Sequence, residues 1–369
     1  MADPFLKKLE KANKKIWLAL FRRIFNNHSV NIPLHPSQTA SIKKILIFRT
    51  DKIGDMIVTT PLFRLLKQQI PGIFIGVCAG PNNHVLAKNC ADVDRVYTLK
   101  QTIPSIIAFV REAKREQYDA SINCIFNKST LNGFLANLVL PRGIKFGRQD
   151  DRYDFFYNCT TPSSWLDIQM TDVICGFAQE FLGIRYEHGM HHPFVNIPDA
   201  SRTTAQQTLS RLGMARFVIL NISAGQTKND IETTRYIEFV NQLAQITQLL
   251  ILLLHTQNDA AKAAEILRQS TYSGLTLYPP THDLFEVAAV IEQCLFVISP
   301  DTAIIHFAAA AKKPVAGFYA MPEITPNHWR PYDVPFEGVR AEEGKGVNSL
   351  LPSQMVDTVR RLIQSTGIA

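Results

Sequence analysis

Short apolar runs alternate along most of the chain with longer stretches in which apolar residues recur every three or four positions. The first pattern predicts buried strands, and the second predicts helices that pack one face on a core. The predicted strands cover residues 44–48, 73–79, 96–99, 120–125, 217–222, 249–255, 275–278, 295–298 and 315–319. The main predicted helices cover residues 55–69, 104–116, 233–246, 259–269, 283–293, 302–311 and 352–363. Because parallel strands need crossover helices, this order predicts an α/β fold with parallel sheets covered on both faces.

The alternation is interrupted at residues 188–198, a segment with two prolines and two adjacent histidines that we interpret as a linker. A length of 369 residues also fits two domains better than one core. We therefore expect Rossmann-like domains over residues 41–190 and 199–345, followed by a closing helix over residues 350–369. Two such halves would leave a cleft between them, and ligands of open α/β sheets bind beyond the carboxyl ends of the strands.

Residues 1–27 form a separate element. Their apolar residues, from Phe5 to Ile24, recur at three- and four-residue steps and predict an amphipathic helix. Seven Lys and Arg against Asp3 and Glu10 give this segment a net charge of +5, so the rest of the chain holds only +2 of the total of +7. A basic amphipathic helix suits either an anionic membrane surface or a place on the protein's own body, and both interpretations stay open. The nearly neutral remainder argues against a nucleic-acid partner.

Neither a membrane span nor a disulfide framework is expected. The longest aliphatic run, residues 249–254, is far shorter than the ~20 residues of a spanning helix, and the charged N-terminus is unlike a signal peptide. The six cysteines are scattered, without Cys-x-x-Cys spacing or a histidine at zinc-site distance. We therefore predict reduced, mostly buried thiols in a cytoplasmic protein that has no metal site.

Residues 299–306 carry the most specific chemical pattern. A predicted strand runs into this segment, and a helix rich in small residues follows at once, with Asp301 or Thr302 as its N-cap. A helix N-terminus at the carboxyl end of a strand binds anions such as phosphate groups, and Thr302 adds a hydroxyl donor. His306, one turn into the helix, could direct a ring nitrogen at the same anion. Taken singly, His306 could equally be a structural histidine and Asp301 only a cap.

A second anion-binding loop follows the predicted strand 217–222. Gly225 allows close backbone approach, and Ser223, Thr227 and Lys228 are donors suited to phosphate oxygens. The spacing is not that of a P-loop. A loop of this composition is also common as a solvated turn, so alone it is weak support for a phosphate site.

The matching loop of the first half, residues 49–55, lacks the Gly-x-Gly-x-x-Gly pattern of dinucleotide-binding enzymes, which argues against an NAD-type dehydrogenase. It places a carboxylate, Asp55, beside Gly54 at the top of a strand. A carboxylate across a cleft from a diphosphate could take the proton of an acceptor hydroxyl during glycosyl transfer. The alternative is that Asp55 only caps the next helix and that Asp51 is a turn residue.

These motifs together resemble the bacterial heptosyltransferases, family 9 of the glycosyltransferases. The resemblance covers roughly residues 43–335 and rests on residues 44–55, 60–62, 71–72, 93–96, 223–228, 299–311 and 313–318. It implies two facing Rossmann-like domains, the GT-B fold, with an acceptor domain first and a nucleotide-sugar domain second. It further implies inverting transfer of a heptose from an ADP-sugar to the lipopolysaccharide inner core, with no metal or other cofactor.

The same resemblance implies roles for single residues. Asp55 would be the general base, and the nucleotide sugar would be held by Ser223, Thr227, Lys228, Asp259, Asp301, Thr302, Ala303 and His306. Asp259 stands where the family keeps an acidic residue for the ribose. Three features depart from the family pattern: Ala303 replaces a usual glycine, and the segments 229–234 and 320–325 lack the usual Lys-x-Trp-Pro and Gly-Pro-Thr-x-Pro.

We therefore expect a glycosyltransferase that uses ADP-heptose and a lipid-anchored saccharide acceptor. Its basic first helix would hold it peripherally on the inner face of the bacterial inner membrane. Two alternatives stay open: another enzyme on this fold, either a transferase for a different nucleotide sugar or a nucleotide-sugar epimerase, and a catalytically inactive nucleotide-binding module. An epimerase should carry additional acid and base carboxylates, which the sequence does not identify.

Overall fold

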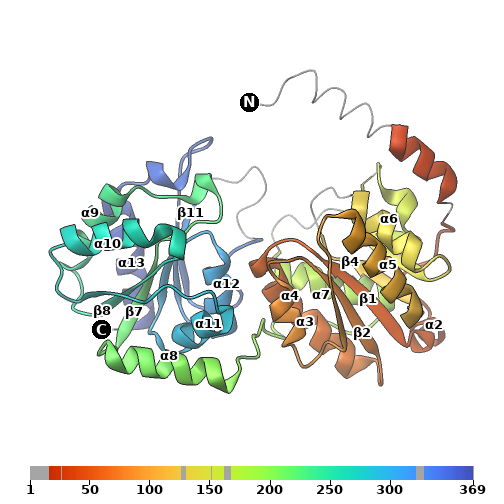
Figure 1. Cartoon of the computed structure of the whole chain (residues 1–369), viewed down its shortest axis with the longest axis horizontal. Helices are drawn as coiled ribbons and strands as arrows, with labels where there is room; N and C mark the ends of the chain where they lie inside the picture. The colour runs from red at the N-terminus through yellow and green to blue at the C-terminus, as the bar shows by residue number, and fades with distance from the viewer. Residues whose placement is uncertain are drawn as a thin grey trace. The chain divides into compact units, whose positions relative to one another are not determined.

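The computed structural model describes residues 16–25, 27–125, 130–150, 152–161, 168–320 and 328–368. These residues form two compact units. Unit 1 holds the described residues within 1–52, 62–165 and 173–188, and unit 2 holds those within 53–61, 166–172 and 189–369. Each unit contains a six-stranded parallel sheet flanked by helices (Figure 1), as the alternating pattern predicted.

The sheet of unit 1 has the strand order β3-β2-β1-β4-β5-β6. Its strands are β1 (Lys44–Arg49), β2 (Phe74–Ala79), β3 (Arg95–Thr98), β4 (Ala120–Asn123), β5 (Ile144–Arg148) and β6 (Cys159–Thr161). The helices along this part of the chain are α2 (Pro36–Ser41), α3 (Ile53–Gln69), α4 (His84–Lys88), α5 (Ile103–Glu116), α6 (Thr130–Val139) and α7 (Met170–Leu182), with the short η1 (Asp154–Phe156). The first turns of α3 and α7 belong to unit 2.

The sheet of unit 2 has the order β12-β11-β10-β7-β8-β9. Its strands are β7 (Phe217–Asn221), β8 (Leu250–Leu254), β9 (Leu275–Leu277), β10 (Val297–Pro300), β11 (Val315–Tyr319) and β12 (Phe336–Arg340). Its helices are α8 (Asp199–Arg211), α9 (Thr233–Leu243), α10 (Ala260–Gln269), α11 (Leu284–Gln293), α12 (Ala303–Ala310) and α13 (Pro352–Thr366), with the short η2 (Thr227–Asn229), η3 (Gln257–Asp259) and η4 (Val347–Ser349).

Both sheets have the strand order 3-2-1-4-5-6 of the Rossmann fold when their strands are numbered within each unit. In unit 2 the chain runs from β7 outward through β8 to β9, then returns to β10 on the other side of β7. The switch point of the sheet therefore lies between β7 and β10, and in unit 1 it lies between β1 and β4. Loops that leave such neighbouring strands in opposite directions leave a crevice at the carboxyl end of the sheet.

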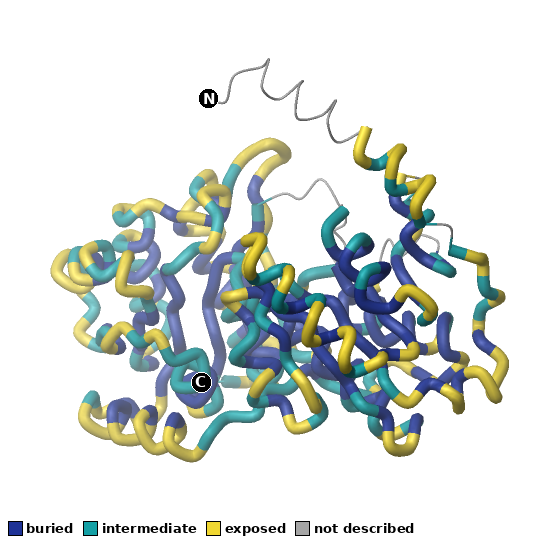
Figure 2. Tube along the Cα trace, turned by 45° about the vertical axis from the view of Figure 1, so that its right-hand side comes forward, coloured by how far each residue is buried: buried dark blue, intermediate teal, exposed yellow. Residues whose placement is uncertain are grey.

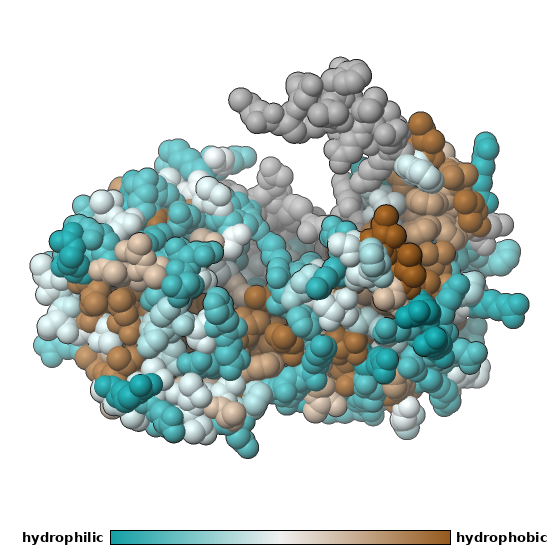
Figure 3. Space-filling model, viewed as in Figure 1, coloured by the Kyte–Doolittle hydropathy of each residue, from teal (hydrophilic) through white to brown (hydrophobic). Residues whose placement is uncertain are grey.

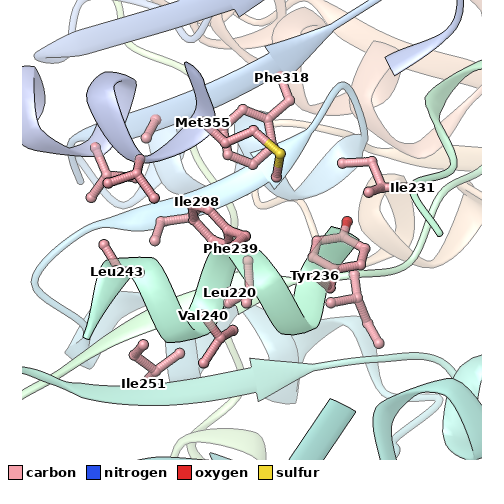
Figure 4. Packing of buried hydrophobic residues seen from close by; sticks show 14 of the residues in the cluster. Leu220, Ile231, Tyr236, Phe239, Val240, Leu243, Ile251, Ile298, Phe318 and Met355 are labelled. Atoms are coloured by element: carbon pink, nitrogen blue, oxygen red, sulfur yellow. The ribbon is translucent and has the colours of Figure 1, made fainter. Parts of the chain in front are cut away.

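The core of unit 2 shows why these residues form these elements. β7 is apolar nearly throughout and buried on both faces, as expected of a central parallel strand. On α9, Tyr236, Phe239, Val240 and Leu243 recur at helical spacing and pack over the sheet (Figure 4). Each such buried side chain contributes about 1.5–3 kcal/mol through the hydrophobic effect. In Figure 2 the strands of both sheets are buried, while the outer faces of the helices are exposed.

The N-terminal helix, which the structure describes over residues 16–24, packs one face on unit 1. Phe21 and Phe25 contact Phe134 of α6 and Phe156 of η1, with the rings of Phe21 and Phe134 4.9 Å apart. The Asn27 side chain donates hydrogen bonds to the Asn137 side chain and to the Phe155 carbonyl, both at 2.9 Å. Residues 1–15 of the predicted basic helix, which hold its five lysines, lie outside the described residues, so the basic helix over residues 1–27 stays a prediction. Among the described residues, no helix combines the length and apolarity needed to span a bilayer.

Candidate active site

Two loops meet at the switch point of unit 2. The loop after β7 begins at Ile222 and carries Ser223, and the loop after β10 carries Asp301 and Thr302. β7 and β10 are paired neighbours in the sheet, so the two loops leave it side by side. The two segments that the sequence singled out as anion-binding are thus placed next to each other.

Asn221, the last residue of β7, joins these loops. Its side-chain amide lies within hydrogen-bonding distance of three oxygens: Ser299 Oγ at 3.0 Å, the Ser223 carbonyl at 3.1 Å and Thr302 Oγ1 at 3.3 Å. The Asn221 side-chain oxygen Oδ1 accepts from the Ser223 backbone N–H at 3.3 Å. Asn221 is buried, so these hydrogen bonds fix the positions of the two loops relative to each other from the core side.

Of the two predicted N-cap candidates, Asp301 and Thr302, it is Thr302 that caps α12. It has extended backbone angles, and its hydroxyl oxygen accepts from the Ile304 N–H at 3.3 Å. Ala303 is the first helical residue. The aligned peptide dipoles give this end of α12 a partial positive charge beside β7. The bond to Ile304 is long, so a phosphate oxygen could compete with Thr302 for that amide.

The loop after β7 turns into the short helix η2, where Thr227 and Lys228 are exposed. Buried Asn229 ties it to the other loop, since its side-chain amide donates to the Asp301 carbonyl at 2.6 Å. Gly346, just before η4, lies against the same turn. A Cβ at Gly346 would come 2.9 Å from the Lys228 carbonyl oxygen, which only a glycine avoids. The position of the Lys228 backbone is therefore set from two sides.

Ser223 and Asp259 lie in direct contact. The Ser223 hydroxyl donates to Asp259 Oδ2 at 2.5 Å and accepts from the Thr256 N–H at 2.8 Å. The Thr256 hydroxyl donates to the same carboxylate oxygen at 2.6 Å. Asp259 therefore holds the β7 loop to the loop after β8. To donate to a phosphate, the Ser223 hydroxyl would have to leave Asp259.

His306 is buried on α12, with its ring 6.0 Å from the ring of Trp329 in a T-shaped contact. The first turn of α3, which belongs to the same unit, lies against this histidine. A Cβ at Gly54 would come 2.5 Å from His306 Cδ2, closer than two such atoms can approach. Gly54 is thus a glycine because the histidine ring occupies the space that a side chain would need.

Asp55 is buried and lies inside the first turn of α3, which begins at Ile53. The alternative that Asp55 is the N-cap of this helix is therefore wrong, because helical geometry starts two residues before it. A carboxylate in the first turn is stabilised by the helix dipole. Asp51 is not merely a turn residue, since it forms an ion pair with buried Arg49 at 3.3 Å. The Arg49 guanidinium also donates to the Cys124 carbonyl at the end of β4.

The residues that the structure adds to the sequence-based set are Asn221, Asn229, Gly346 and Trp329. None contributes a charge, and each acts by fixing the position of a predicted residue. The one signal in the sequence for Asn221 is an amide in an otherwise apolar strand. Within the described part of the chain, no group of three His, Cys, Asp or Glu side chains could hold a metal ion.

A comparison with family models decides the class of this site. The model of glycosyltransferase family 9 (heptosyltransferase) matches residues 106–351, about two-thirds of the chain. The chain belongs to glycosyltransferase family 9. The match covers both loops of the unit 2 site but begins after the segment with Asp55. As a member of this family, the protein is a glycosyltransferase.

Several solved glycosyltransferase structures share the fold. A family 9 glycosyl transferase from Veillonella parvula superposes with a TM-score of 0.73 at 17% identity, covering 88% of this chain and 97% of that one. The E. coli ADP-heptose lps heptosyltransferase II gives a TM-score of 0.68 at 16% identity, with 88% and 99% covered. E. coli heptosyltransferase WaaC, solved with ADP, gives 0.67 at 19% identity, with 86% and 99% covered. The expected GT-B architecture is thereby confirmed.

Proposed function

We propose that this glycosyltransferase moves a heptose from an ADP-activated donor to the inner core of a lipopolysaccharide or lipooligosaccharide. The observation that carries the proposal is the pair of loops joined by Asn221 at the switch point of unit 2, within the part of the chain that the family model matches. E. coli heptosyltransferase WaaC, which has this fold, was solved with ADP and also with ADP-2-deoxy-2-fluoro heptose. Both ligands support an ADP-sugar donor here.

The donor's diphosphate would lie at the N-terminus of α12. There the backbone amides, the Thr302 hydroxyl and the exposed Lys228 ammonium would face its oxygens. Thr227, Ser223, Asp301, Ala303 and His306 would complete the site, with Asp259 toward the ribose. Because negative charge builds up on the diphosphate as the sugar leaves, donors fixed at this position stabilise the transition state more than the ground state.

Asp55 would act as the general base. Its carboxylate would accept the proton of the acceptor hydroxyl while that oxygen forms a bond to the anomeric carbon. The bond from this carbon to the diphosphate breaks on the opposite face, so the configuration inverts and ADP leaves with the electron pair. The burial of Asp55 and its place beside Gly54, against which His306 packs, support this role. Such assistance typically contributes about 10²–10⁴-fold.

The proposed acceptor is anchored in lipid, so the enzyme would work at the cytoplasmic face of the membrane. The net charge of +5 on residues 1–27 supports attraction to anionic lipids.

An alternative donor, a nucleotide sugar other than ADP-heptose, has one feature in its favour. Ala303 places a methyl group at the first position of α12, where a glycine would let a phosphate come closer. A different nucleotide sugar would fit a site altered in this way.

A donor screen tests the proposal. The full chain would be incubated with ADP-heptose, other ADP-sugars and UDP-sugars, each with a lipid-free truncated core saccharide. Release of the nucleoside diphosphate and the mass of the product would both be measured. We expect ADP release and a product heavier by one heptose with ADP-heptose alone. Turnover of UDP-sugars alone would contradict the donor, and ADP release without a heavier acceptor would contradict the transfer.

A further inference from the structure

The N-terminal helix has a second apolar face that points away from the protein. Leu18, Phe21 and Phe25 pack inward, whereas Ile16, Trp17, Leu20 and Ile24 are exposed, with 67% of the surface of Ile16 and 55% of that of Trp17 accessible. The helix therefore packs one face on unit 1 and at the same time presents a second apolar face to solvent.

Helix α5 adds a second exposed apolar surface on the same unit. Its inner side buries Phe109 and Ala113, while Ile103 and Ile107 on its outer side are 74% and 61% exposed. α6 contacts both helices: it packs against α5, and its Phe134 contacts Phe21 of the N-terminal helix. In Figure 3, hydrophobic residues gather over the N-terminal helix and over the start of α5 on the same visible face of the molecule. We call these six exposed residues, Ile16, Trp17, Leu20, Ile24, Ile103 and Ile107, the apolar patch.

Cations border the apolar patch on both helices. Arg23 lies three residues after Leu20 and Arg111 lies four residues after Ile107, spacings that place them on the same helix faces, and both are exposed. Lys114 continues the face of α5. The sequence that leads into the N-terminal helix adds five lysines. Aliphatic side chains and a tryptophan bordered by Lys and Arg match the chemistry of an anionic lipid surface, which takes apolar groups between its headgroups and attracts cations.

We propose that the apolar patch is a composite membrane-docking surface, in which α5 inserts into anionic lipid together with the N-terminal helix. Two helices fixed to one rigid body contact a plane at separate points, so binding would orient unit 1 on the membrane instead of merely tethering it. The inference deepens the membrane part of the proposed function by assigning α5 to it.

Vesicle flotation tests this surface without donor or acceptor. The full chain would be mixed with vesicles of phosphatidylcholine alone or with an equal part of phosphatidylglycerol. The α5 variant Ile103→Ser/Ile107→Ser and the helix variant Ile16→Ser/Leu20→Ser would be compared with a control, Leu267→Ser/Leu351→Ser, which removes exposed leucines of unit 2. Because each replaced isoleucine or leucine loses part of its transfer free energy, we expect each patch variant to bind anionic vesicles about tenfold more weakly and the control to bind normally.

Several results would overturn the proposal. An α5 variant that binds like the unaltered protein would exclude α5 from the surface, and equal binding to both kinds of vesicle would exclude anionic lipid. A dimer in sedimentation that the patch variants abolish, without vesicle binding, would assign the patch to a second copy of the chain. Circular dichroism would verify that each variant is folded. The donor screen uses a lipid-free acceptor and the flotation assay uses no substrate. A failure of the proposed transfer can therefore be distinguished from a failure of membrane docking.

Discussion

Asn221 and Asn229 are buried amides that connect the loops after β7 and β10. Neither has a charge to offer a ligand, yet each donates to an oxygen on the opposite loop. An amide suits this task because it supplies two N–H donors and one acceptor from a short, neutral side chain that can be buried without an ion partner. At the residue scale, the candidate site thus depends on neutral groups that position the charged ones.

Replacing Asn221 tests this dependence. In Asn221→Leu the donors to Thr302, Ser299 and the Ser223 carbonyl are lost, so we expect the dissociation constant for ADP to rise about tenfold. Asn221→Asp should be at least as damaging, because a carboxylate of the same shape accepts but does not donate. Calorimetric titration with ADP measures both. Asn241→Leu, a change of the same type on α9, serves as the control, and an unaltered affinity in the Asn221 variants would contradict the role.

Asp55 is the residue on which the proposed chemistry depends. Asp55→Asn keeps the shape of the side chain and removes the base, so we expect the transfer rate to fall about 10²–10⁴-fold while the affinity for ADP stays within about twofold. Asp199→Asn, in the first turn of α8, is the matched change on another helix and should leave transfer intact. Rates are measured by ADP release with the truncated acceptor. Retained transfer in Asp55→Asn would remove Asp55 from the mechanism.

The sequence sufficed to select the two loops of unit 2, because Thr302, Lys228 and Ser223 bear functional groups in a strand–loop–helix context. It did not reveal the residues that organise the loops. Asn221 looks like the polar end of a strand, and Gly346 lies in a region without a motif. Their roles depend on which segments the fold brings together, such as the Lys228 carbonyl against Gly346, and no local pattern encodes that.

At the scale of elements, hydrophobic periodicity predicted the central strands well because a strand buried on both faces is a continuous apolar run. It missed β5, β6 and β12. β5 contains Lys145, whose buried ammonium donates to the carbonyls of Leu140 and Gly143, so the strand does not read as apolar. β6 is three residues long, and β12 is a partly exposed edge strand. Such strands show neither the continuous apolar run of a buried strand nor the apolar–polar alternation of a half-buried one.

The contact between the first turn of α3 and α12 gives a prediction at this scale. In Gly54→Ala the new methyl group overlaps His306, so α3 or the imidazole must shift, at a cost of about 1–3 kcal/mol. We expect a lower melting temperature and a transfer rate reduced about tenfold. Because His306→Ser vacates the space, Gly54→Ala should lower the melting temperature less in the His306→Ser background than in the unaltered protein. Gly176→Ala on α7, where a Cβ meets nothing within 4 Å, is the control.

At the scale of the whole molecule, each unit has its own apolar core, and five of the six buried thiols lie in unit 1, with Cys294 in unit 2. Burial raises the pKa of Cys90 to about 11 and that of Cys124, Cys159 and Cys294 to about 12, from an ordinary value of 9.0. Burial raises the pKa of Cys78 as well. Above pH 9 the unfolded chain loses these protons while the folded chain keeps them, so the folded state is progressively disfavoured.

We therefore expect the thiols to make the free energy of unfolding fall steeply above about pH 9. Each thiol contributes up to about 1.4 kcal/mol per pH unit. Burial lowers the pKa of Lys145 to about 8, so this one group makes the free energy of unfolding rise with pH above about 8 and offsets part of the fall. Urea denaturation under reducing conditions between pH 7 and 11 measures the profile, and Cys294→Ala should make it less steep. A profile that stays flat to pH 11 would be incompatible with buried thiols.

The inward face of the N-terminal helix has a practical consequence for anyone who shortens this protein. Phe21 and Phe25 cover Phe134 and Phe156, so removing residues 1–27 would strip an aromatic cluster of its cover as well as removing the positive charge. The shortened protein would tend to self-associate and to adhere to lipid through the newly bared rings. A shortened chain that begins at residue 16 keeps Phe21 and Phe25 in place, and so do substitutions confined to the outward side chains. Either change would keep the protein monodisperse while its membrane affinity is altered.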